Sequence, residues 1–266
     1  MSYPLYRWLV RRSAATLASW VMTLALYEWL LIVIYPSIAR SPALSAAIRT
    51  LPKGLLSAFG LGSAHETLTV FLSSEFFSMI WILALVYFVA VEASRIPAGM
   101  LERGQMTPLL LTPASRGSIV LATTAALLTE IFVIDAISLA CAALLAALYG
   151  VSVAGVNFAL LGVGSFVLLA LLCAIGMTAS CILPEERRAL GAVGGISFVF
   201  YVMDFAARIS PRLAGLEHLT PFSAYRPEAL LAGHAPAVAL WLMAIGTAIL
   251  IGLAAALFAR RDLRSA

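Results

Sequence analysis

From Ala136 to Pro184 the chain reads AISLACAALLAALYGVSVAGVNFALLGVGSFVLLALLCAIGMTASCILP, and no side chain in this stretch carries a charge. About 20 helical residues cross the hydrocarbon core of a bilayer, which is about 30 Å thick. The stretch is therefore long enough for two crossings, and the glycines Gly150 and Gly155 mark the turn between them. This pattern predicts a membrane protein that crosses the bilayer more than once.

The whole chain has the same character, because 62% of its residues are hydrophobic and only 11% are charged. Soluble domains carry about 25% charged residues. The apolar segments are continuous rather than alternating, so they predict helices and not barrel strands, and the fold class is all-α. We expect six spans, at Ala15 to Tyr35, Phe76 to Val91, Ser118 to Ala147, Val156 to Leu183, Ala189 to Ala207 and Ala235 to Ala259.

Basic residues indicate the orientation of these spans. Most of the 17 Lys and Arg residues lie near the two termini and in the segments that follow spans two and four. The positive-inside rule then places both termini in the cytoplasm. Because the charges are spread along several membrane edges, we expect membrane lipids and no nucleic acid as partners. Residues 1–14 are expected to form an interfacial segment at the lipid headgroups.

The connecting segments are too short for soluble domains, so one transmembrane domain is expected over residues 1–266. The outer loop 36–74 has apolar residues at mostly helical spacing and is expected to form short surface helices. The outer loop 208–234 is expected to hold a helical piece near Pro227 to Ala232. Asp204 and Arg208 precede it at a spacing that predicts an ion pair within one helix turn.

Several kinds of site are missing from the sequence. The only lysine, Lys53, is not preceded by a glycine-rich phosphate loop, and no nucleophile elbow or metal-spaced Cys and His cluster is present. We therefore expect no catalytic residues, no bound metal and no nucleotide site in this chain.

The cytoplasmic segment 94–117 carries more information than a simple tether. Glu102 and Arg103 precede the leucine run Leu109 to Leu111. Apolar residues flanked by charges on such a segment predict a short amphipathic helix that needs a partner.

Five stretches of the chain together resemble the permease subunits of ABC-2 type transporters, which have the architecture of type V exporters. They are Pro52 to Gly60, Glu102 to Met106, Pro113 to Arg116, Thr220 to Tyr225 and Phe258 to Leu263. The sequence departs from the pattern at Gln105 and Met106, where threonine and leucine are commoner, and at Leu101, where a second acidic residue is usual.

The resemblance implies a permease that pairs with a second copy or a similar permease and docks two ATPase subunits. ATP and Mg would be bound by those subunits, and the chain itself would need no cofactor. The residues implied in ATPase coupling are Glu102, Arg103, Gly104, Pro113, Ser115 and Arg116. A plainer alternative is that Glu102, Arg103 and Arg116 only mark the membrane edge.

Two carboxylates, Glu130 and Asp135, lie near the middle of the third span. An ionised carboxylate costs roughly 2.5–3.5 kcal/mol at the centre of a membrane helix. Five residues at about 100° each place the two groups on different faces of the helix. One can meet a substrate cavity while the other forms a hydrogen bond between helices, so both are candidates for the substrate path and for structural roles.

Three residues are candidates for contacts at a dimer interface. Glu28 in the outer half of span one could pair across an interface or extend toward the membrane surface, and Gly191 and Gly195 form a G-x-x-x-G spacing in span five. Such a spacing permits close helix contact, either between subunits or within one.

The resemblance favours an ATP-driven exporter of an amphipathic substrate (a drug, an antibiotic or a lipid) in the bacterial inner membrane. One alternative is an ion-coupled secondary transporter in which Glu130 or Asp135 carries a proton. Another is a lipid-modifying membrane enzyme, although no acid/base or metal constellation supports it.

Overall fold

The computed structural model describes residues 2–39, 72–106, 115–149 and 157–260. Every regular element in these ranges is a helix, which confirms the all-α prediction. The long helices are α1 (Tyr3–Ala39), α5 (Ile82–Ser94), α8 (Arg116–Leu148), α9 (Phe158–Ile182), α10 (Glu186–Ile209) and α12 (Ala237–Arg260). The described residues contain six helical spans long and apolar enough to cross a membrane, close to the predicted positions.

The first helix begins earlier than expected. Helix α1 runs without a break from Tyr3, so residues 3–14 are helical and continuous with the span, and their position at the lipid headgroups stays a prediction. Pro4 lies in the first turn, where a helix tolerates proline, and no further proline or glycine follows before Tyr35. The sequence therefore contains no breaker that would separate the segment from the span.

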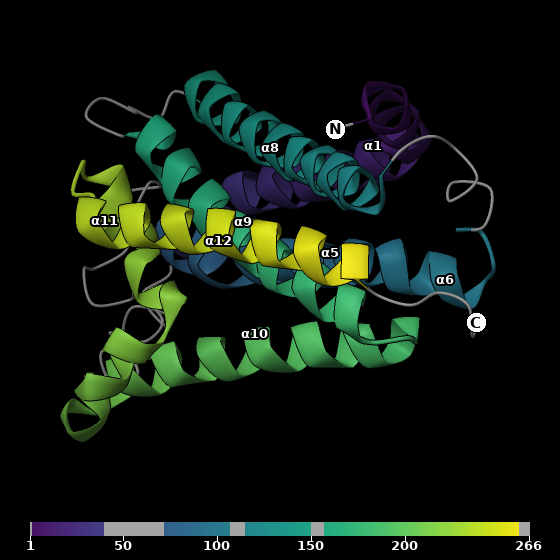
Figure 1. The fold of residues 1–266 in the computed structure, drawn as a ribbon. Coiled ribbons are helices and arrows are strands. Elements are labelled where there is room, and N and C mark those ends of the chain that lie inside the picture. Colours follow the sequence, from purple (N-terminus) through teal and green to yellow (C-terminus); the bar gives the residue numbers. More distant parts are fainter. Residues whose placement is uncertain (1, 40–71, 107–114, 150–156, 261–266) are drawn as a thin grey trace.

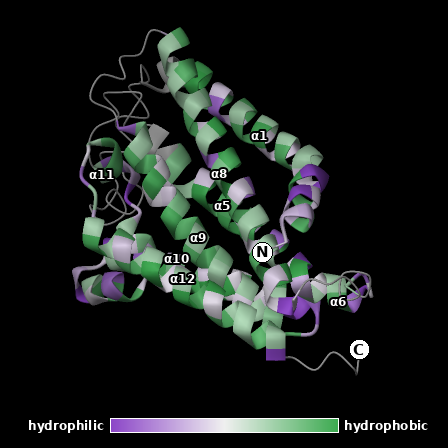
Figure 2. Ribbon diagram, turned by 45° about the horizontal axis from the view of Figure 1, so that its top comes forward, coloured by the Kyte–Doolittle hydropathy of each residue, from purple (hydrophilic) through white to green (hydrophobic). Residues whose placement is uncertain are grey.

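The spans alternate in direction (Figure 1), so that α1 begins and α12 ends at the same end of the bundle. Arginines collect at this end, among them Arg7, Arg95, Arg103 and Arg187. We call it the inner end and the opposite one the outer end. Figure 2 shows hydrophobic residues along the lengths of the long helices and more hydrophilic ones near the inner end of the bundle.

Helix α9 is the centre of the bundle and packs against α5, α8, α10 and α12. Half of the most apolar 18-residue stretch of α9 is buried inside the protein, whereas the buried share of the corresponding stretch in the first span is 17%. Glycines permit this packing: a Cβ on Gly176 would lie 2.7 Å from the Cβ of Ala93. Small residues at such crossings let the helix backbones approach closely.

The second span is bent at its inner end. It consists of the π-helix η1 (Leu72–Trp81), then α5, the turn η2 (Arg95–Gly99) and the short α6 (Met100–Glu102). Ile96 has extended backbone angles (φ −136°, ψ 120°) because the ring of Pro97 disfavours the helical conformation of the residue before it. Glu102 and Arg103 follow this bend in the chain.

Other expectations have mixed outcomes. At the outer end, α11 (Pro227–Leu231) lies at the predicted position, and the 3-10 helices η3 (Pro211–Leu219) and η4 (Pro221–Ala224) precede it. The outer-loop helices expected in 36–74 fall mostly within 40–71, outside the described residues. The leucine run 109–111 also lies outside them.

Candidate functional site

At the inner end, the segment after span two is bound to the first residue of α10. The Nη1 of Arg103 donates a hydrogen bond to Oε2 of Glu186 and forms an ion pair with it. Oε2 of Glu102 accepts a hydrogen bond from the backbone N–H of Glu186 at 2.8 Å. The first N–H groups of a helix have no partner within the helix and favour a negative charge nearby. Two neighbouring predicted residues thus converge on one residue 83 or 84 positions along the chain.

Two glycines make this arrangement possible. A Cβ on Gly99 would meet Oε2 of Glu186 and lie 2.9 Å from Nη2 of Arg103, so an alanine there would displace the ends of both side chains. Gly104 has φ +66°, a left-handed conformation that other residues rarely adopt. It lies in the turn over residues 103–106, which also carries Arg103.

The other predicted coupling residues lie at the start of α8. Ser115 is the N-cap, and its Oγ accepts a hydrogen bond from the N–H of Ser118 at 3.2 Å. Arg116 is the first residue of the helix. Pro113 lies outside the described residues. The cap gives Ser115 a structural role, beside which its coupling role stays a prediction.

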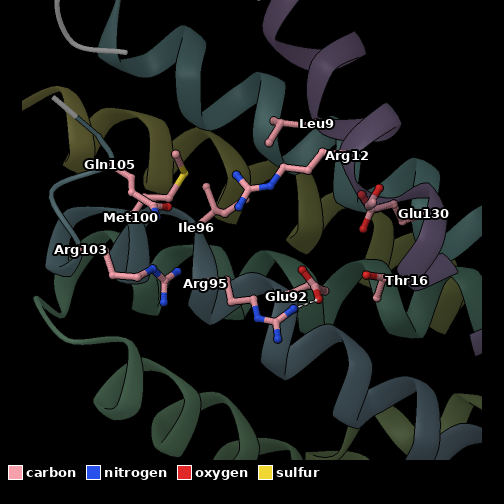
Figure 3. Close-up of a pocket in the computed structure, with 11 residues that line it drawn as sticks. Leu9, Arg12, Thr16, Glu92, Arg95, Ile96, Met100, Arg103, Gln105 and Glu130 are labelled. Carbon is pink, nitrogen blue, oxygen red and sulfur yellow. Dashed lines mark hydrogen bonds and ion pairs between the residues drawn. The ribbon is translucent and has the colours of Figure 1, made fainter. Parts of the chain in front are cut away.

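A polar cavity of about 290 Å³ lies next to this contact, between the inner end of α1 and the bent end of span two (Figure 3). Its lining combines three arginines, two glutamates and a smaller apolar wall. The lining residues are Leu9, Arg12, Ser13, Thr16, Glu92, Arg95, Ile96, Met100, Arg103, Gln105 and Glu130.

The two carboxylates of the third span have different surroundings. Glu130 is 6% exposed and lines the cavity, as Ser13 does. Asp135 is 3% exposed, and its Oδ1 accepts a hydrogen bond of 2.8 Å from Ser165 of α9. Helix geometry predicts this separation, because the two residues occupy different faces of α8.

The sequence model of one family, described as "ABC-2 family transporter protein", matches residues 11–263. This match spans nearly the whole chain. The chain belongs to the ABC-2 transporter family. No curated protein matches it. The family, together with the six apolar helices, makes the chain a multi-pass membrane component of an ABC transporter.

Glu28 of this ABC-2 protein lies inside the subunit rather than on an outer face. It is fully buried, and its Oε1 accepts a hydrogen bond of 2.6 Å from Ser138 of α8. The same Ser138 oxygen accepts one from Nε1 of Trp81 at 2.8 Å. The carboxyl therefore joins three elements of one chain, and its role at a dimer interface stays a prediction.

Sequence reasoning did not find Ser138 or Trp81, because neither belongs to a motif. The sequence signal that remained was the presence of polar atoms within apolar spans, which must find partners in a bilayer. Gly191 and Gly195 of the ABC-2 protein have no atom within 4 Å of an added Cβ. They do not mediate packing inside the described part of the subunit, and their role at a dimer interface stays a prediction.

The outer end of this ABC-2 subunit is held by buried contacts. Arg208 and Asp204 form the predicted ion pair, at 2.7 Å. The hydroxyl of Tyr225 donates a hydrogen bond of 3.0 Å to the backbone oxygen of Phe77. Burial raises the pKa of Tyr225 well above its ordinary value of 10.0, with the nearby charge of Asp135 as a smaller cause in the same direction. Tyr225 belongs to the Thr220 to Tyr225 motif, for which the structure thus provides a packing reason.

Proposed function

We propose that this chain is the permease subunit of an ATP-driven exporter in the bacterial inner membrane. Two copies, or this chain and a similar permease, would form the transport path for an amphipathic substrate. Two separate ATPase subunits would bind ATP and Mg and dock at the inner end. The absence of a phosphate loop from the sequence supports this division of labour.

The contact of Glu102 and Arg103 with Glu186 carries the proposal. It ties the segment after span two to the start of α10, which packs directly on α5 and α9. An ATPase that pushes on this segment would move the inner ends of α5 and α10 together, rather than a loop alone. Coupling of this kind needs an element with two arrangements, and an exposed ion pair can change partners at low cost.

The remaining predicted residues add to this proposed contact with the ATPase, to the contact with a second permease and to the substrate path. Ser115 and Arg116, at the start of α8, lie at the same end of the bundle, and Pro113 precedes them in the chain. Gly191 and Gly195 leave one face of α10 open to close contact with a second permease. The substrate-path candidates Glu130 and Asp135 each line a cavity, and Asp135 also accepts a hydrogen bond from Ser165.

A charge-swap experiment tests the proposal. The single variants Arg103→Glu and Glu186→Arg place like charges against each other, and the double variant restores an ion pair with the opposite polarity. We expect each single change to lower ATPase stimulation by about tenfold, as a loss of about 1.4 kcal/mol implies. The double variant should recover most of it. The ATPase is first identified by co-purification from native membranes, and its stimulated turnover is then measured.

The pair Arg188 and Glu185 provides the control, because it also lies at the start of α10 and is more exposed. Swapping its charges should leave stimulated turnover unchanged. A double swap at 103 and 186 that recovers nothing would count against a transmitting role for this pair. Transport by vesicles containing only this chain would favour the ion-coupled alternative and remove the need for an ATPase.

A further inference from the structure

Three guanidinium groups from different elements line the cavity at the inner end. Arg12 comes from α1, Arg95 from η2 and Arg103 from the turn after α6. Nη1 of Arg95 donates to Glu92 at 2.5 Å, and Nη1 of Arg103 donates to Glu186. A guanidinium has five N–H donors, so these bonds leave most of the donors for a ligand. The guanidinium of Arg12 lies 5.1 Å from the centre of the Trp8 ring. This contact uses the face of the guanidinium and leaves the N–H groups along its edge for a ligand.

The charges in the cavity are distributed unevenly. Glu92 neutralises Arg95, with which it forms an ion pair. Figure 3 shows Glu130 on the side of the cavity away from Arg103 and Gln105, and within the described residues it forms no ion pair with an arginine. Glu186 likewise forms an ion pair with Arg103. Within the described residues Arg12 forms no ion pair, so its positive charge favours an anion in the cavity.

The lining also indicates the kind of anion. Arginine forks match the oxygens of phosphate in bidentate geometry. The apolar side chains of Leu9, Ile96 and Met100 form another part of the wall, as suits the glycerol or first methylenes of an amphiphile. At about 290 Å³ the cavity is larger than several water molecules of about 30 Å³ each, which is enough space for a phosphate and its first attached carbons.

We propose that this cavity binds a phosphate group, carried either by an anionic lipid of the inner leaflet or by a soluble phosphate ester. The site goes beyond the proposed function, because its occupancy needs neither ATP nor the ATPase. It also adjoins the proposed coupling contact, because Arg103 both lines the cavity and forms the ion pair with Glu186. A bound phosphate and α10 would thus share one guanidinium.

Binding to the full-length chain in neutral detergent tests the proposal. The probe is fluorescently labelled phosphatidylglycerol, compared with diacylglycerol that bears the same chains and label. We expect phosphatidylglycerol to bind at least about tenfold more tightly, and Arg12→Gln to remove about that factor, since charge-assisted hydrogen bonds to phosphate are strong. Arg11→Gln is the matched control, because it removes the same charge from the neighbouring, exposed residue of α1, which does not line the cavity.

Equal losses in the two variants, or equal binding of the charged and neutral lipids, would overturn the proposal and leave only diffuse attraction by surface charge. Thermal unfolding of each variant checks folding, and Arg12→Lys, which keeps the charge without the fork, should show an intermediate loss. Competition by millimolar glycerol 1-phosphate assigns the site to soluble esters, and its failure assigns the site to lipid. Because no ATPase is present, a negative result leaves the proposed function untouched.

Discussion

The two ends of the bundle are held together by different kinds of contact. At the outer end, Tyr225 is 3% exposed and its hydroxyl reaches the backbone of Phe77, whose side chain is fully buried. At the inner end, the side chains of Arg103 and Glu186 are 46% and 26% exposed. The contact of Tyr225 with Phe77 excludes water, and the contact of Arg103 with Glu186 remains in reach of it.

This difference has an energetic consequence. Buried contacts with defined geometry are costly to break, because each lost partner leaves a polar group or a cavity behind. Exposed ion pairs are worth about 0–1 kcal/mol and can exchange one partner for another. The outer end is therefore suited to remain rigid while the inner end rearranges, as the proposed coupling to an ATPase requires.

The largest expected effect on folding comes from Phe77→Ala at the outer end. The Phe77 ring lies 4.9 Å from that of Phe76 and 5.5 Å from that of Trp81, so truncation leaves a cavity in a tightly packed cluster. We expect a loss of about 3 kcal/mol in the free energy of unfolding. Thermal unfolding in detergent measures it, with Phe198→Ala on the exposed face of α10 as control. Comparable losses in both variants would contradict a rigid outer cluster.

A smaller effect is expected from Tyr225→Phe, which removes one buried hydrogen bond, worth about 1 kcal/mol. The change also has a pH signature. The pKa of Tyr225 is raised in the folded protein, so the stability linked to it is complete below about pH 10 and is lost as the pH rises further.

The free energy of unfolding, measured between pH 9 and 11, should therefore fall more steeply in the parent than in Tyr225→Phe, by up to about 1.4 kcal/mol per pH unit. The parallel variant Tyr149→Phe, at an exposed residue, should not flatten this dependence. Identical slopes in the parent and Tyr225→Phe would show that Tyr225 is not sealed from water.

The smallest effect on folding is expected at the inner end, from Gly99→Ala. The new methyl group displaces the Arg103 and Glu186 pair, at a cost below about 1 kcal/mol because the pair is exposed. Stimulated ATPase turnover should nevertheless fall severalfold, since the contact that carries the proposed coupling is lost. Gly252→Ala, at a helix position with open space around it, is the control. Normal coupling in Gly99→Ala would separate the pair from function.

The sequence alone determined the parts of this protein that depend on local composition. Apolar runs long enough to cross a bilayer predicted the six spans found in the described residues, and the spacing of Asp204 and Arg208 predicted their ion pair. Ordered motifs along the chain indicated the ABC-2 family, and the family match over residues 11–263 confirmed it. A bilayer imposes these features because every backbone polar group must be satisfied within its own helix.

Only the tertiary structure decided which distant residues meet. Nothing near Glu102 in the sequence indicates Glu186, and nothing near Glu28 indicates Ser138, because these contacts depend on how the helices cross. The same is true of the cavity, which α1 and the bend at Ile96 form together. Hydropathy specifies that a helix lies in the membrane, but all six helices share it, so it does not choose their neighbours. Glycines at close crossings and pairing between sparse polar groups make that choice.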